Sequence, residues 1–286
     1  MTLAEAILLT ITTAAQPLLL AAIGELVVER SGVLNLGVEG MIVMGAVVAF
    51  AAAQLTGSAY LGALFGMAAG CLFSLLFAFL TLTLVANQVA TGLALTILGL
   101  GLSGMIGESF VGQRGVQLEE IAIPVLSSIP LIGNLLFNQD LIFYISIFSV
   151  FGVSWFLFKT RLGLQLRAIG DSHGSAHALG ISVIKTRYLA VMFGGACAGL
   201  AGAQLSLVYT PQWVENMSAD GSHVRWWSLP VGVRCGFWLV PICLVLSPLA
   251  NCMLRRLVSG YPPSSCLRFP IWQRSLFLLS YRVTDV

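Results

Sequence analysis

Long apolar runs without a charged side chain dominate the pattern of the sequence. An α-helix needs about 20 mainly apolar residues to cross the hydrocarbon core of a bilayer, where all its backbone hydrogen bonds must be internal. The second run is long enough for about three such crossings, and each of the others for one. The runs that lack Asp, Glu, Lys and Arg are residues 6–24, 40–107, 141–158, 188–214 and 235–254.

Two polar interruptions divide the longest run. Thr56-Gly57-Ser58 and Asn87-Gln88 break the apolar sequence, so each predicts a turn between two helices. The pattern therefore predicts an all-α polytopic membrane protein with six transmembrane helices and a seventh candidate at 235–254. We interpret residues 6–24 as the first span and not as a signal peptide, because no basic residue precedes the run and no clear cleavage site leads into soluble sequence.

The composition agrees with a membrane protein. Of the 286 residues, 58% are hydrophobic and 9% are charged, with a net charge of +2, whereas soluble domains carry about 25% charged residues. This composition excludes a disordered tail, a nucleic-acid-binding domain and a disulfide-stapled secreted module. The six cysteines are scattered without metal-ligand spacing. Dense glycines and alanines, as in residues 194–202, predict close helix–helix packing.

The basic residues indicate the orientation, because short cytoplasmic loops carry an excess of Lys and Arg. Residues 159–187 hold five of the seven basic residues that precede residue 217, so we expect this loop to be cytoplasmic. The loop 107–140 carries one Arg against four acidic residues and is expected to face outward. Counting back through three spans places residues 25–36 on the cytoplasmic side and the N-terminus outside.

Residues 29–41 form the first candidate functional segment. Three glycines within nine residues weaken a continuous helix by about 1 kcal/mol each relative to Ala. In one interpretation this is an interrupted helix, and Asn35 and Glu39 line a translocation path. In the other, Glu39 caps a first turn in the headgroup layer and Asn35 ends a loop. Asn87 and Gln88 also allow two interpretations. They either cap the next helix or present amide groups to a polar solute.

The loop 159–187 is the second candidate segment. It is too polar to insert into the membrane, yet it carries several apolar side chains. Asp171 or Ser172 can cap a short helix over 172–179, and Gly180 lies where a C′ glycine would end it.

One face of this short helix would carry Ala176 and Leu179, which lie three residues apart. A capped helix outside the membrane and flanked by arginines suits docking to a cytoplasmic protein. The alternative is an ordinary anchoring loop held by headgroup phosphates.

Motifs that would indicate catalysis or metal binding are not convincing in this sequence. His173 and His177 have the spacing of a zinc pair, but they lack the intervening Glu and an evident third ligand. Residues 99–104 match GxGxxG formally, but they lie inside a charge-free run without a strand–turn–helix context. We therefore predict no catalytic residue, no metal and no cofactor.

Several segments resemble one family. Residues 29–41 resemble the N-terminal signature of ABC importer permeases of the sugar, nucleoside and branched-chain amino acid group. Residues 86–95 match a second block, found in the nucleoside or simple-sugar subfamily. Residues 160–181 are similar to the family's coupling-helix loop, and residues 188–203 continue the likeness, which extends over residues 10–217.

The resemblance implies a multi-pass permease subunit of a bacterial inner membrane, in which residues 1–217 form the transmembrane domain. It implies a pore made with a second permease subunit, identical or not, a pair of cytoplasmic ABC ATPase subunits and an extracytoplasmic solute-binding protein. Because the ATPase supplies the energy, the chain itself would not be an enzyme. The residues of the coupling loop would be Thr160, Arg161, Gly163, Arg167, Gly170, Ala176, Leu179 and Gly180.

The implied cargo is a nucleoside or a simple sugar. The alternatives are a branched-chain amino acid permease, a non-transporting helical membrane scaffold and an ion-driven carrier. A carrier would bury ionisable groups near the bilayer midplane, and the charge-free runs contain none.

The composition changes after Met217. Residues 217–286 hold seven of the twelve arginines, six of the ten prolines and four of the six cysteines, but only two alanines. We could not match residues 218–286 to the family. One hypothesis is that this aberrant tail is read in a shifted frame; the other is a genuine divergent tail with a span at 235–254 that Pro241 and Pro248 would kink.

Overall fold

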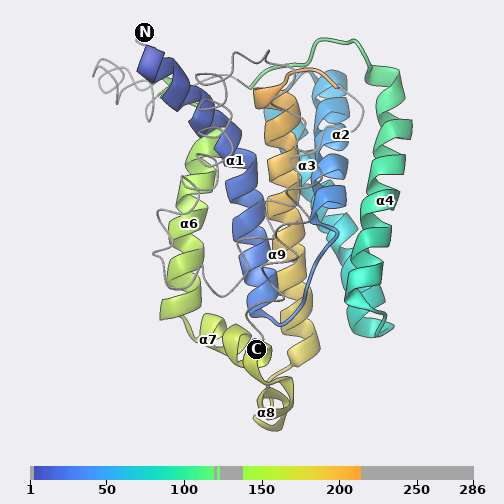
Figure 1. The fold of residues 1–286 in the computed structure, drawn as a ribbon, viewed down its shortest axis with the longest axis vertical. Coiled ribbons are helices and arrows are strands. Elements are labelled where there is room, and N and C mark those ends of the chain that lie inside the picture. The colour runs from blue at the N-terminus through green and yellow to red at the C-terminus, as the bar shows by residue number, and fades with distance from the viewer. Residues whose placement is uncertain (1–2, 119–120, 123–137, 214–286) are drawn as a thin grey trace, which may run out of the picture. The chain divides into compact units, whose positions relative to one another are not determined.

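The computed structural model describes residues 3–118, 121–122 and 138–213 (Figure 1). The regular secondary structure of this part of the chain is helical apart from one short strand pair, in which β1 (Ile121–Ala122) is antiparallel to β2 (Asn138–Gln139). The π-helical turns η1 (Phe79–Thr83) and η3 (Leu205–Tyr209) extend α3 and α9, and the 3₁₀ turn η2 (Glu108–Phe110) follows α4. The α-helices are α1 (Leu3–Arg30), α2 (Val38–Thr56), α3 (Ala59–Ala78), α4 (Gln88–Gly107), α6 (Leu141–Lys159), α7 (Arg161–Asp171), α8 (His173–Ala178) and α9 (Val183–Gln204).

Within the described residues, five helical segments are long and apolar enough to cross a membrane. They correspond to the second to sixth predicted spans. The predicted first span, residues 6–24, lies within α1, which also carries Glu25, Glu29 and Arg30 and is not among the five. The seventh candidate, 235–254, lies outside the described residues. The five segments are Val38–Thr56, Ala59–Thr83, Gln88–Phe110, Leu141–Lys159 and Val183–Tyr209.

Both predicted interruptions of the long apolar run are present. Helix α2 ends at Thr56, and Gly57 takes the left-handed conformation with φ +68° that a glycine adopts without strain. Helix α4 begins after Asn87, whose side chain accepts hydrogen bonds from the backbone N–H groups of Val89 and Ala90 at 3.0 and 3.3 Å. This is a helix N-cap.

The core forms around α9, which packs against α1, α2 and α3. Glycine is required where these helices touch: a β-carbon added to Gly45 on α2 would lie 2.6 Å from the Cα of Gly199 on α9. A β-carbon at Gly70 on α3 would lie 2.7 Å from the same atom. Small residues thus let three backbones approach one another, as the glycine-rich run 194–202 predicted.

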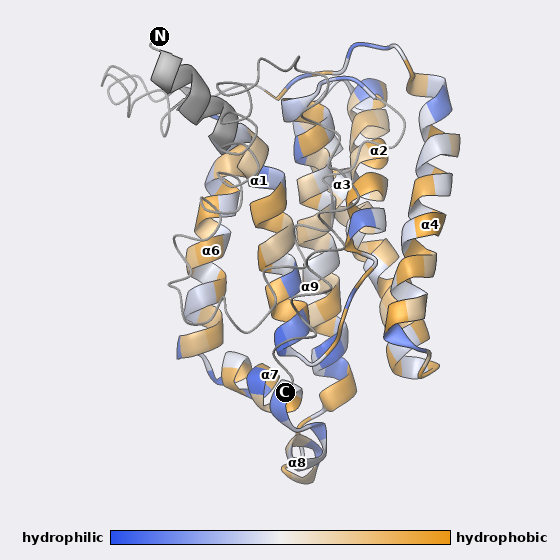
Figure 2. Ribbon diagram, in the orientation of Figure 1, coloured by the Kyte–Doolittle hydropathy of each residue, from blue (hydrophilic) through white to orange (hydrophobic). Residues whose placement is uncertain are grey.

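The outer helices expose apolar side chains. Helix α4 contacts mainly α2, and α6 leaves Phe148 and Trp155 exposed. Figure 2 shows apolar residues along most of α4 and α6 and more hydrophilic residues in α7. Apolar surface of this extent suits contact with lipid or with another membrane subunit.

Candidate functional site

The segment between α1 and α2 is an irregular loop at residues 31–37. The hydroxyl of Ser31 donates to the Val28 carbonyl at 2.6 Å and closes the last turn of α1. Gly32 follows with φ +80°, in the left-handed region that favours glycine. The chain then continues without helical structure to Val38, where α2 begins. The interruption predicted from the glycines of residues 29–41 is therefore present.

Asn35 is buried, and its polar atoms are used inside this loop. Its Oδ1 accepts from the Gly37 N–H at 3.0 Å, and its Nδ2 lies 3.6 Å from the Met41 sulfur. Its backbone N–H donates to Oε1 of Glu25 at 3.3 Å. In this structure Asn35 orders the bend, and Glu39 lies half-buried in the first turn of α2, where the helix dipole favours a carboxylate.

Helix α4 holds the loop from one side. Oε1 of Gln88 accepts from the Leu34 N–H at 2.9 Å, and the Thr96 hydroxyl donates to the Leu36 carbonyl at 3.2 Å. A β-carbon at Gly92 would lie 2.9 Å from the Leu36 nitrogen. The neighbouring Asn87 and Gln88 therefore do different things: Asn87 caps its own helix, and Gln88 ties α4 to the loop.

Helices α7 and α9 hold the loop from the other side. Nε of Arg187 on α9 donates to the Ser31 carbonyl at 3.1 Å. On α7, the Cα of Gly170 lies against Gly32, and a β-carbon at Gly170 would collide with the Arg30 carbonyl oxygen. The structure thus joins the predicted coupling loop to residues 30–32 through one hydrogen bond and one close backbone contact.

The N-terminal half of the predicted coupling loop is a helix, α7, which the sequence analysis did not predict. Thr160 caps it by accepting from the Gly163 N–H at 3.0 Å. Gly163 packs directly on α6, where a β-carbon would collide with the Phe156 carbonyl. Leu166 and Ile169 are buried. The signal was present in the sequence, since Thr160 precedes apolar residues at helical spacing.

The predicted short helix over 172–179 is present as α8. Ser172 is its N-cap and accepts from the Ser175 N–H at 3.4 Å, and Gly180 takes φ +78° after its end. The expectation that Ala176 and Leu179 share a face is wrong. Ala176 is 2% exposed and Leu179 is 79% exposed, because Leu179 lies beyond the last helical residue.

The two predicted arginines of α7 differ in environment. Arg161 is exposed at the first helical position. Arg167 is half-buried, and its guanidinium carbon lies 5.2 Å from the centroid of the Phe158 ring, a cation–π contact. Arg161 is therefore available at the surface, whereas Arg167 fixes α7 on α6.

Spanning helices with a capped helix pair beyond their ends define a polytopic membrane protein (Figure 1). Comparison with known protein families identifies the family to which the chain belongs. Residues 7–224 match the family described as "Branched-chain amino acid transport system / permease component", and the chain belongs to this family.

Individual relatives are similar over the same region. The chain is 40% identical over 222 residues to the putative glucose ABC transporter permease protein TsgC13 of Haloferax volcanii, covering 76% of this chain and 68% of that protein. It is 37% identical over 204 residues to the guanosine ABC transporter permease protein NupQ of Bacillus subtilis, covering 66% and 63%. It is 34% identical over 198 residues to the nucleoside ABC transporter permease protein NupC of Lactococcus lactis, covering 65% and 62%.

The matched region thus spans about two thirds of the length of these relatives. No solved structure matches the chain.

Proposed function

We propose that the protein is the membrane-spanning permease subunit of an ATP-driven ABC importer and forms part of the translocation path for a nucleoside or a simple sugar. The observation that carries the proposal is the junction of α7 and α9 with residues 30–32, through Gly170 and Arg187. The family match and the glucose, guanosine and nucleoside permeases among the relatives support it.

The proposed partners follow from this role. A cytoplasmic ABC ATPase would contact α8 and Leu179, which directly follows α8 and exposes an apolar side chain outside the spanning helices. A second permease subunit would complete the path, and an extracytoplasmic solute-binding protein would deliver the solute. ATP hydrolysis belongs to the ATPase, and the chain would reside in the plasma membrane.

The geometry supports a mechanical route from the ATPase to the path. A displacement of α8 moves α7, because one residue separates the two helices. Helix α7 contacts the end of α1 at Gly170, and the loop 31–37 continues to α4 through Gln88. Closure of the ATPase pair would thus reach α2 and α4 as a rigid-body shift, the kind of motion that alternates access.

Uptake assays test the proposal. Cells that express the chain with an ABC ATPase and a solute-binding protein are given labelled guanosine, glucose or leucine. ATP-dependent uptake of guanosine or glucose is the expected result. Uptake of leucine alone would establish the branched-chain amino acid alternative, and no uptake of any solute by an assembled complex would favour the scaffold.

Docking is tested separately by Leu179→Asp. A charge at this exposed position should abolish recovery of the ATPase in a pull-down, because it replaces the apolar contact. Leu55→Asp is the matched control, since Leu55 is 82% exposed and lies at the other end of α2 from the loop 31–37. Equal recovery with both variants would contradict docking through α8.

A further inference from the structure

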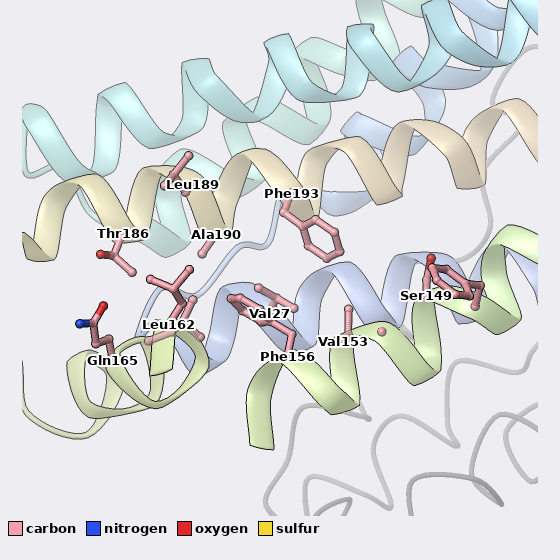
Figure 3. A pocket seen from close by; sticks show the side chains of 13 residues that line it. Val27, Ser149, Val153, Phe156, Leu162, Gln165, Thr186, Leu189, Ala190 and Phe193 are labelled. Carbon is pink, nitrogen blue, oxygen red and sulfur yellow. The ribbon is translucent and has the colours of Figure 1, made fainter. Parts of the chain in front are cut away.

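An apolar groove of about 440 Å³ lies between α1, α6, α7 and α9 (Figure 3). Val27, Phe156, Leu162 and Phe193 form its walls. Phe148 is 77% exposed and also lines the groove. The groove is therefore continuous with the outer apolar surface of α6, which in a bilayer faces the acyl chains.

The groove is polar at one end. Figure 3 shows Gln165 and Thr186 together at the α7 end, and apolar side chains between them and Ser149. Two basic residues flank this end: Arg161 lies one helical turn before Gln165, and Lys185 precedes Thr186. Both are exposed.

The polar end lies where headgroups are expected. Helix α6 is a candidate span that ends at Lys159, and α7 starts two residues later. A helix that combines buried apolar residues with arginines and follows the end of a span lies at the membrane interface. Arg161 and Lys185 are thus placed at headgroup level, and the apolar part of the groove lies at acyl-chain level.

The lining has room for a flexible hydrocarbon chain. The closest helix contacts around α9 use glycine against glycine, as between Gly45 and Gly199. Beside the groove, α1 and α6 pack through larger side chains such as Val27 and Val153. The groove presents Phe and Leu side chains, and a β-carbon at its one glycine, Gly152, would meet no atom within 4 Å. Without an occupant these side chains would lose their dispersion contacts.

We propose that this groove binds an acyl chain of an anionic phospholipid, with the lipid phosphate held by Arg161 and Lys185. The apolar walls give no selectivity among lipids, because the tail exchanges one hydrocarbon environment for another. The two cations give the selectivity, since basic residues near the surface of a membrane attract anionic headgroups. The inference requires only that the helices span a bilayer, and it is independent of the transported solute.

Native mass spectrometry of the purified chain tests the groove. The full-length protein is exchanged into phosphatidylglycerol or phosphatidylcholine with identical tails, and the lipids retained after delipidation are counted. Wild type is expected to retain one phosphatidylglycerol in preference to phosphatidylcholine. Gly152→Leu should lose it, because the new side chain fills the groove. Gly101→Leu is the matched control, since a β-carbon at Gly101 on α4 also meets no atom within 4 Å.

Headgroup recognition is tested by Arg161→Gln and Lys185→Gln. Each should weaken phosphatidylglycerol binding about fivefold and leave phosphatidylcholine unchanged, as expected for the loss of one cation near an anionic lipid. Equal retention of lipid by Gly152→Leu and Gly101→Leu would overturn the proposal. So would crosslinks from a photoreactive residue at position 152 to another part of the chain or to a second copy, because the occupant would then be protein.

Discussion

At the scale of single residues, the most unusual feature is a pair of buried glutamines. Gln204 on α9 donates from its Nε2 to Oε1 of Gln16 on α1, and both side chains are at most 2% exposed. The remaining atoms, Nε2 of Gln16 and Oε1 of Gln204, have no hydrogen-bond partner among the described residues. Each buried amide therefore has the other as its hydrogen-bond partner, and removing one side chain leaves the other amide without a partner.

This dependence predicts non-additive stability changes. Gln16→Leu and Gln204→Leu should each lower the free energy of unfolding by about 1–3 kcal/mol, because the surviving amide becomes a buried polar group without a partner. The double variant should cost less than the sum, since no amide remains. Titration with a denaturing detergent measures all three variants, and strictly additive changes would contradict the dependence.

Asn87 and Gln88 give a second prediction at this scale. Gln88→Leu removes the acceptor for the Leu34 N–H, so uptake should fall severalfold while ATPase recovery stays unchanged. Asn87→Leu removes only the helix cap and should cost about 1 kcal/mol of stability. Asn87→Ser keeps a capping oxygen and is the control for that loss. If Gln88→Leu transports as well as wild type, the tie between α4 and the loop has no part in transport.

At the scale of elements, the contact of α7 with the end of α1 is the step that connects the coupling loop to the spanning helices. Gly170→Val should separate them, because its β-carbon would collide with the Arg30 carbonyl. Uptake should drop strongly, and ATPase recovery should persist because α8 is unchanged.

The matched control for this contact is Gly101→Val, since a β-carbon at Gly101 on α4 meets no atom within 4 Å and Gly101 lies outside α7 and α8. Assays of uptake and pull-down on the same preparations compare the two valines. Unchanged uptake with Gly170→Val would mean that this contact does not transmit the movement.

The elements also show how far sequence reasoning reaches. The turn at Gly57, the cap at Asn87 and the short helix after Ser172 were predicted because each depends on residues close together in the chain. The hydrogen bond between Gln88 and Leu34 joins residues 54 positions apart, and the one between Arg187 and Ser31 joins residues 156 positions apart. Partners so far apart depend on how the helices pack, which apolar periodicity does not specify. The sequence alone therefore left open whether Asn35 lines a path or ends a loop, and it did not predict the hydrogen bonds by which Asn35 orders the bend.

At the scale of the whole molecule, the side of the membrane that α8 occupies decides whether the proposed coupling can operate. The loop 31–37 and helices α7 and α8 must face the ATPase, and the turn at Gly57, one span away along α2, must face the opposite side. The five basic residues within 159–187 predict that α8 is cytoplasmic.

Cysteine labelling decides this orientation. Gly57→Cys and Gly174→Cys are introduced one at a time into a chain whose six native cysteines are serine. Neither position has an atom within 4 Å of an added β-carbon, so both side chains have room, although the φ of +68° at position 57 costs Gly57→Cys some backbone strain. In sealed cells a membrane-impermeant maleimide should label position 57 at once and position 174 only after permeabilisation. Labelling of position 174 from outside would place α8 beyond the reach of any ATPase, because ATP is hydrolysed in the cytoplasm, and the coupling role of α7 and α8 would then have to be abandoned.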